Sequence, residues 1–297
     1  MEAKICRYKN NAKGAFTFVF DDGCYGESTE WVYEIFKGIY EKTGVKFKAT
    51  SAQTVGFISP RLKDRWVELF EQGYFDLSAH SLNHCIGYNK NTPSEELHKD
   101  AKSSQEELYK MYGIKPLTYV TPGGGSDEVG WNALKSYYIA NRNGNDRINI
   151  PSKIDWYDVG TFTAMLKRTN EEYKNNIDEV IKMGGWSVQI NHWVTKKDED
   201  VFHSQSYDTF VYECDYLAKK AKENEIWVSS FNDAVLYLQE AENSTLEIKE
   251  TDTEYEITLV CPLDKDIYNY PLTIEVKLEN TATCVDILPN QTIKIGK

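Results

Sequence analysis

The sequence predicts an α/β protein in which alternating strands and helices form a parallel sheet or barrel, with a small all-β region at the C-terminal end. Three observations lead to this prediction. Short apolar runs rich in β-forming residues alternate with amphipathic helical patterns along residues 15–240. Polar residues capable of chemistry directly follow several expected strands. After Glu242, apolar and polar residues alternate with the period of two that is typical of a half-buried strand.

The first strand is expected at residues 15–20, and it ends at Asp21-Asp22-Gly23. A helical pattern follows, in which Trp31, Ile35 and Ile39 share one face. The strand, loop and helix unit then recurs along the chain. Further strands are expected at residues 45–51, 74–79, 117–121, 137–140, 186–191 and 226–230, and further helices at 60–72, 94–112 and 207–223.

The C-terminal pattern differs from the rest of the chain. Residues 254–260 and 272–278 alternate apolar and polar side chains, as strands with one buried face do. We place the boundary at Asn243-Ser244. Residues 1–242 are therefore expected to form the larger α/β domain, and residues 243–297 a small β-sandwich accessory domain.

Composition excludes some classes of partner. Lys and Arg total 34 against 46 Asp and Glu, and the net charge of −12 argues against binding to nucleic acid. Neutral sugars fit better, since 20 Tyr and 7 Trp supply flat amphipathic rings, although such rings also fill cores. No apolar run reaches the roughly 20 residues needed for a membrane span. The polar start of the chain favours the cytoplasm, or secretion if a signal segment has been removed.

Cysteines are scattered without Cys-x-x-Cys spacing, which argues against a zinc knuckle or a thioredoxin-like site. Buried free thiols are the expected state. A Cys261–Cys284 disulfide is the alternative for an exported protein.

Three groups of polar residues follow expected strands. Asp21 and Asp22 are adjacent carboxylates that would repel each other without a nearby cation, although Asp-Gly is also a common turn. His80 and His84 are spaced to point two imidazoles at one ion, and a solvated surface pair is the alternative. His192 follows residues 186–191, where a histidine beside Trp193 could instead be packed. The carboxyl ends of the strands lie on one face of a barrel. Because all three groups of residues follow strands, their positions together favour an active site on this face.

These segments resemble the motifs of a known family. Residues 18–23 resemble the first motif of the polysaccharide deacetylases of carbohydrate esterase family 4, residues 80–84 resemble their His-Ser/Thr-x-x-His motif, and residues 190–192 resemble their Leu-x-His motif. Residues 226–231 are similar to the closing strand of the family. The resemblance therefore covers roughly residues 14–240, and it implies a distorted (β/α) barrel of the polysaccharide-deacetylase type.

The resemblance also implies an activity. If the resemblance holds, the chain is a hydrolase that removes N- or O-linked acetyl groups from an oligosaccharide or polysaccharide. Asp21 would be the general base and His192 the general acid. A divalent metal, usually zinc with cobalt, nickel or manganese as alternatives, would be held by Asp22, His80 and His84.

The third motif departs from the family pattern. The sequence has Val120-Thr121-Pro122-Gly123-Gly124-Gly125 where the family has Arg-x-Pro-Tyr, so the arginine that braces the base is missing. Pro122 and Gly123 still allow a backbone N–H to approach an oxyanion. Arg142 and Arg147 are both candidates to replace the arginine.

The fourth motif is only partly present, as residues 152–156. Asp155 is expected to orient and charge His192, with a surface cap as the alternative. Ile190, Trp156 and Trp193 are expected to line the substrate pocket, although core packing is equally open for the two tryptophans. Cys24 and Cys85 are expected to pack around the metal ligands without binding the ion.

A rival hypothesis is a catalytically silent carbohydrate-binding protein that keeps the barrel. The missing arginine favours it. The presence of all five residues with direct chemical roles, Asp21, Asp22, His80, His84 and His192, argues against it.

Overall fold

The computed structural model describes residues 1–23, 26–197, 204–279 and 281–297. Its centre is a closed barrel of seven parallel strands, in which β2 pairs with both β3 and β8 and so closes the ring. A further parallel strand, β11 (Ile226–Val228), pairs with β2. This confirms the predicted barrel. The ring consists of β2 (Gly14–Phe20), β3 (Ala49–Gln53), β4 (Phe75–Ala79), β5 (Thr118–Val120), β6 (Ala140–Asp146), β7 (Val159–Thr163) and β8 (Trp186–Asn191).

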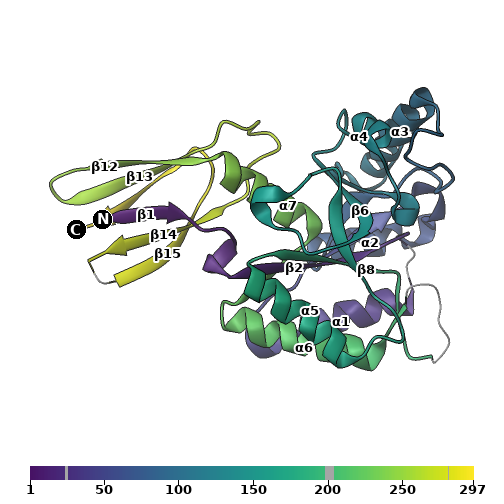
Figure 1. Ribbon diagram of the computed structural model, residues 1–297, viewed down its shortest axis with the longest axis horizontal. Coiled ribbons are helices and arrows are strands. Elements are labelled where there is room, and N and C mark those ends of the chain that lie inside the picture. Colours follow the sequence, from purple (N-terminus) through teal and green to yellow (C-terminus); the bar gives the residue numbers. More distant parts are fainter. Residues whose placement is uncertain (24–25, 198–203, 280) are drawn as a thin grey trace.

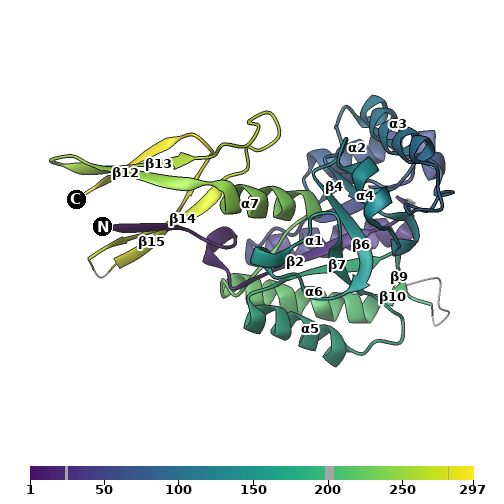
Figure 2. The ribbon, with the colours of Figure 1, turned by 45° about the horizontal axis from the view of Figure 1, so that its top comes forward.

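Helices cover the outside of the barrel. Helices α1, α5 and α6 lie together on one side, and α2, α3 and α4 lie on another (Figures 1 and 2). A short parallel pair of strands, β9 (Trp193–Thr195) and β10 (Ser204–Ser206), follows β8. The helices are α1 (Glu27–Thr43), α2 (Lys63–Glu71), α3 (Ser94–Tyr112), α4 (Glu128–Leu134), α5 (Asn170–Met183), α6 (Tyr207–Lys222) and α7 (Phe231–Asn243). Among the described residues, no helix is long and apolar enough to cross a membrane.

Local sequence signals set the helix ends. Helix α5 begins with a capping box, because the Thr169 hydroxyl accepts from the Glu172 N–H while the Glu172 carboxylate accepts from the Thr169 N–H. Helices α1 and α3 end at Gly44 and Gly113, both in the left-handed conformation that glycine adopts without steric cost.

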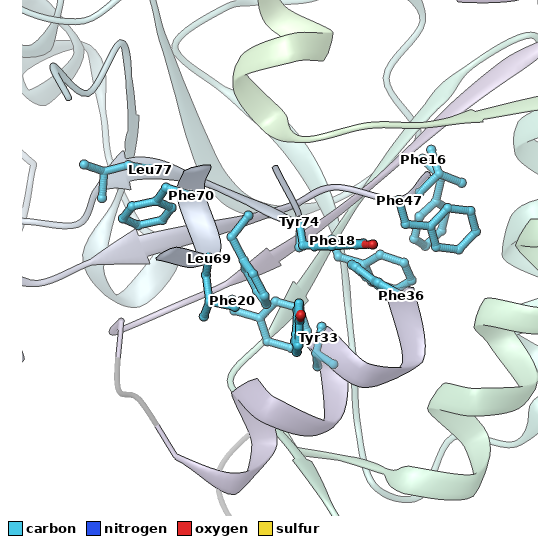
Figure 3. Close-up of a cluster of buried hydrophobic side chains, with 14 of the residues drawn as sticks. Phe16, Phe18, Phe20, Tyr33, Phe36, Phe47, Leu69, Phe70, Tyr74 and Leu77 are labelled. Atoms are coloured by element: carbon cyan, nitrogen blue, oxygen red, sulfur yellow. The ribbon is translucent and has the colours of Figure 1, made fainter. Parts of the chain in front are cut away.

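Strand β2 is buried along its whole length and contributes to two clusters of apolar side chains. Phe16, Phe18 and Phe20 pack between the barrel and its helices, where the ring centre of Phe18 lies 5.8 Å from that of Phe36 in α1 (Figure 3). Ala15 and Val19 belong instead to a second cluster, which joins alternate barrel residues to α7 and to strands of the C-terminal region. The period of two along β2 therefore directs its side chains to opposite faces of the barrel wall.

The C-terminal region contains two three-stranded antiparallel sheets. One has the order β12 (Thr245–Glu250), β13 (Glu254–Val260) and β16 (Thr292–Gly296). The other consists of β14 (Leu272–Leu278), β15 (Thr281–Ile287) and β1 (Glu2–Ile5). Because β1 pairs with β14, the first residues of the chain join this region, a pairing that a boundary at residue 242 does not include. Helix α7 lies between these sheets and the barrel (Figures 1 and 2).

Between residues 137 and 186 the observed strands and helices differ most from those expected from the sequence. The strand expected at residues 137–140 begins instead at Ala140, because Tyr137 and Tyr138 belong to the turn after α4. Strand β7 and helix α5 were not expected. Strand β6 is polar along most of its length, and α5 buries only Tyr173, Ile177 and Val180, so neither carries a strong apolar pattern.

Candidate metal centre and active site

The structure brings the three predicted metal ligands together. Asp22 follows β2, and His80 and His84 follow β4. The Nε2 atoms of His80 and His84 lie 3.6 and 3.7 Å from Oδ1 of Asp22. All three candidate ligand atoms lie within 4.8 Å of one another. One nitrogen from each histidine and a carboxylate oxygen form the type of donor set that suits zinc, so the residues fit the ion that the resemblance implies.

The backbone around these ligands is strained. Asp22, Ser81 and His84 have φ angles of 69°, 75° and 58°, in the left-handed region that non-glycine residues rarely adopt. Each such residue costs on the order of 1–3 kcal/mol and persists only where the surroundings impose it. Strain of this kind is concentrated at functional sites.

Hydrogen bonds hold both histidines in place. Nδ1 of His80 lies 2.7 Å from the carbonyl oxygen of Val120, so this nitrogen donates and Nε2 is left for an ion. Asp100 of α3 accepts hydrogen bonds from the Ser81 hydroxyl and from the Leu82 N–H, both at 3.1 Å. The Ser81 oxygen in turn accepts the His84 N–H at 3.1 Å. The carboxylate of Asp100 thus fixes the loop between the two histidines.

The arginine that the third motif lacks is supplied by another strand. Nη2 of Arg142, on β6, lies 2.5 Å from Oδ2 of Asp21, and both side chains are buried. Arg147, the other candidate, pairs instead with Asp158 at 2.8 Å. Because β6 is the neighbour of β5 in the barrel, the guanidinium reaches the carboxylate from one strand further along.

A cavity of about 320 Å³ contains this set of residues. Gly123 and Gly124 form one wall, and both have left-handed φ angles. A Cβ atom on Gly144 would lie 2.6 Å from the carbonyl oxygen of Gly124, so the two loops touch backbone to backbone. The cavity is lined by Asp21, Asp22, His80, His84, Gly123, Gly124, Arg142, Gly144, Thr163, Ile190 and His192.

The electrostatics of the site favour a carboxylate at Asp22. Burial raises the pKa of Asp22, but the hydrogen bond and charge of His80, together with His192 and His84, lower it by more, so the pKa lies below its ordinary value. An ionised Asp22 is the form that binds a cation.

Not every predicted residue lies at this cavity. Gly123 and Ile190 line it, whereas Pro122 is buried and lies outside the lining. Trp193 lines a neighbouring groove.

The structure corrects the expectations for Asp155 and Trp156. Asp155 accepts the Tyr157 N–H at 3.0 Å and lines a different cavity with Arg147, and Trp156 packs against the second buried cluster. Both residues precede β7 and so lie at the amino end of that strand, whereas His192 follows the carboxyl end of the parallel strand β8.

The cysteine expectations hold only in part. Cys6, Cys85, Cys214, Cys261 and Cys284 are free, so the alternative Cys261–Cys284 disulfide is absent from this structure. Cys85 and Cys284 are exposed, contrary to the expectation of buried thiols. Cys24 lies outside the described residues.

Comparison with family models gives one match. Residues 8–141 match the family model described as polysaccharide deacetylase. The match covers a little under half of the chain, and this part is similar to polysaccharide deacetylases. The predicted enzyme class, a carbohydrate deacetylase, is confirmed by this match. No curated protein sequence matches the chain.

Solved structures of similar fold include a proposed polysaccharide deacetylase from Mycobacterium smegmatis. It has 12% identity and a TM-score of 0.57 over 85% of this chain and 99% of that chain. A family 4 acetyl xylan esterase from Clostridium thermocellum, in complex with a cobalt ion, has 16% identity and a TM-score of 0.48 over 74% and 89% of the two chains. The peptidoglycan deacetylase PdaC from Bacillus subtilis has 16% identity and a TM-score of 0.44 over 77% and 91%. The first of these likenesses supports the barrel fold of this chain.

Proposed function

We propose that this polysaccharide deacetylase removes acetyl groups from an oligosaccharide or polysaccharide, with a divalent ion, zinc in the first place, held by Asp22, His80 and His84. The observation that carries the proposal is the meeting of these three ligand atoms beside Asp21 and His192 in one cavity. When bound, such an ion polarises an acetyl carbonyl group and makes a water molecule more acidic.

Asp21 is suited to act as the general base. Oδ2 accepts a hydrogen bond from Arg142, which holds the carboxylate in one orientation. Oδ1 is buried and has no hydrogen-bond partner among the described residues, so it can accept the proton of an attacking water. Arg142 also balances the negative charge of the buried Asp21 carboxylate before this transfer.

His192 faces the same cavity from the end of β8 and is placed to protonate the leaving oxygen or nitrogen of the sugar. The Gly124 N–H donates a hydrogen bond to the Thr121 carbonyl oxygen at 3.0 Å. The Gly123 N–H is therefore our candidate donor to the oxyanion that develops during attack. Ile190 and Thr163 complete the wall around the acetyl group.

The test is acetate release from two substrate panels, O-acetylated xylo-oligosaccharides and N-acetylglucosamine oligomers. Asp21→Asn and His192→Ala should each lower the rate roughly 10²-fold or more, the usual contribution of a positioned base or acid. Asp155→Asn is the matched control, because this exposed residue lies outside the cavity. If the parent protein released no acetate from either panel with zinc, cobalt or manganese added, the proposed function would be wrong.

A further inference from the structure

A row of buried polar side chains ends at the residue that precedes His192. It runs from Glu213 on α6 through Gln205 on β10 to Asn191, the last residue of β8. All three residues are fully buried, and burying polar side chains is unfavourable unless they form hydrogen bonds. Together with Gln189, also buried and also on β8, we call these residues the amide network.

Hydrogen bonds join the members of the amide network. The side-chain amide of Asn191 donates to Oε1 of Gln205 at 2.9 Å, and the amide of Gln205 donates in turn to Oε2 of Glu213 at 2.7 Å. Gln189 donates to the same two oxygens, at 3.2 and 3.1 Å. The end of β8 is therefore fixed to β10 and α6 at two alternate residues.

The backbone is held on both sides of His192. On one side, the carbonyl oxygen of Asn191 accepts the N–H of Asp21, the proposed base, at 2.9 Å. On the other side, the Val194 N–H donates to the hydroxyl oxygen of Ser28 in α1 at 2.7 Å. Strand β9 also pairs with β10, which carries part of the amide network. Asn191 is thus the residue through which the network sets the position of the acid relative to the base.

The amide network has more buried acceptors than donors. Oε1 of Glu213, Oε1 of Gln189 and Oδ1 of Asn191 are buried and have no hydrogen-bond partner among the described residues. A proton on Glu213 would turn one of these acceptors into a donor, and burial raises the pKa of Glu213 to about 7. Glutamine has nearly the same shape and also offers a donor, so it can replace Glu213 in the network.

We propose that Gln205 and Glu213 are positioning residues for the acid step of the reaction. Acting through Asn191, they hold His192 where it can give its proton to the leaving oxygen or nitrogen as the bond to the acetyl group breaks. Neither Gln205 nor Glu213 lines the active-site cavity. The proposal rests on the proposed function, which gives His192 its role as the acid.

Two small acetate esters separate this role from general damage to the fold. The leaving group of 4-nitrophenyl acetate departs without protonation, whereas 2-methoxyethyl acetate releases a basic alkoxide that needs the acid. Neither ester requires recognition of a sugar, and O-acetylated xylo-oligosaccharides provide a second alkoxide leaving group. Rates are measured on the full chain supplied with zinc.

Gln205→Met and Glu213→Met keep the length of the side chain and remove the hydrogen bond between them. Each should lower kcat for the alkoxide substrates roughly 10-fold or more, with little change in KM, because a small displacement of a catalytic group is costly. The rate for 4-nitrophenyl acetate should change by less than about twofold, since this ester does not use the acid. Glu213→Gln restores the hydrogen bonds and should restore most of the rate for the alkoxide substrates.

Glu240→Met is the matched control. Glu240 is another fully buried carboxyl, which accepts the Tyr270 N–H at 2.9 Å, but it lies on α7 and outside the cavity. This substitution should leave the ratio of the two ester rates unchanged. Thermal melts establish folding, and Gln205→Asn, one methylene too short to keep both hydrogen bonds, takes the place of a methionine variant that does not fold.

Equal loss of both ester rates in the folded variants, or no loss for the alkoxide substrates, would overturn the positioning role. Failure of Glu213→Gln to restore the rate would overturn the part of Glu213. A selective loss with the small esters, in a protein that releases no acetate from either sugar panel, would keep the positioning role and reject the proposed function. A parent protein inactive on both esters and both sugar panels would overturn both proposals.

Discussion

The guanidinium of Arg142 lies 2.5 Å from the carboxylate of Asp21, and it comes from β6 instead of from the strand that precedes the glycine-rich third motif. The pair is almost fully buried, with side-chain exposures of 1% and 5%. A barrel brings the ends of neighbouring strands close together, so an arginine can serve the same carboxylate from either strand. This relationship weakens the case for a silent protein, because the missing motif arginine was its main support.

Arg142→Gln should lower both activity and stability. Removing one partner of a buried ion pair leaves an uncompensated charge and costs about 3–5 kcal/mol of unfolding free energy. We expect a lower melting temperature and a rate of acetate release reduced by at least ~10-fold, since the base also loses its orientation. Arg147→Gln, which breaks a more exposed pair with Asp158, should change both measurements little. Equal effects of the two substitutions would contradict the special role of Arg142.

Asp100→Asn should weaken metal binding without removing a ligand. An amide keeps Oδ1 only as an uncharged, weaker acceptor for the Ser81 hydroxyl and the Leu82 N–H, and its NH₂ group cannot accept the hydrogen bond that the Tyr88 hydroxyl donates to Oδ2 at 2.7 Å. The loop that carries His84 should therefore loosen. Losses of roughly 10- to 100-fold in affinity are usual for groups that hold metal ligands in place. Titration with zinc measures the effect, and Asp178→Asn on α5 serves as the control. Unchanged zinc affinity in folded Asp100→Asn would show that Asp100 does not position the ligands.

Because Glu213 is buried, we predict that the free energy of unfolding depends on pH. Its carboxyl is buried, and burial raises the pKa from an ordinary value of 4.5 to about 7, although Gln205 and Gln189 donate hydrogen bonds that oppose the rise. The folded state therefore binds more protons than the unfolded state between these two pH values. It follows that the free energy of unfolding decreases as pH rises through this window, by about 3 kcal/mol for this group.

Glu213→Gln keeps the shape of the side chain and removes its titration. The free energy of unfolding of the variant should therefore increase relative to that of the parent as pH rises from about 4.5 to about 8. Denaturant melts measure this difference. The carboxyl of Glu240 also has a raised pKa of about 7, because of burial, but it is present in both proteins and cancels in the difference. A stability difference that does not vary with pH would contradict the prediction.

The division at residue 242 stays a prediction. A chain that ends at Glu242 should fold, because the barrel has its own core, but it should melt at a lower temperature than the full chain. The truncation removes the N–H groups of Tyr270 and Thr273, which donate to the Glu240 carboxylate at 2.9 Å and to the Tyr237 hydroxyl at 3.3 Å, and it removes strands against which α7 packs. Removing residues 1–6 as well should cost little more, since β1 would have lost its partner β14. Aggregation of both truncations would mean that the β sheets complete the barrel core.

The sequence predicted the parts of the molecule that carry strong local patterns. Residues 94–112 and 186–191 are helix and strand as expected, and the motifs around Asp22, His80 and His192 meet in one cavity. Residues whose role depends on packing between strands could not be predicted in this way. Arg142 stands in a polar strand without apolar alternation, and only the closed barrel shows which carboxylate it contacts.

The prediction that Asp155 orients His192 was wrong for a related reason. A partial motif match fixes the residue type but not which end of a strand the residue occupies. The resemblance of residues 152–156 to the family segment is interrupted, and the structure places Asp155 before β7. The roles of Gly144 and Thr163 at the cavity were also missed, although the run Gly123-Gly124-Gly125 already indicated a close backbone approach.

Metal-dependent deacetylation at Asp22, His80 and His84 is tested most directly by measuring acetate release while the metal is removed and then returned. Chelator-treated protein should release acetate at a small fraction of the original rate. Adding about one equivalent of zinc per chain should restore the rate in the parent protein but not in His80→Ala, which lacks one of three ligands. Full activity in chelated protein of verified metal content near zero, or full zinc-dependent activity in His80→Ala, would contradict the claim.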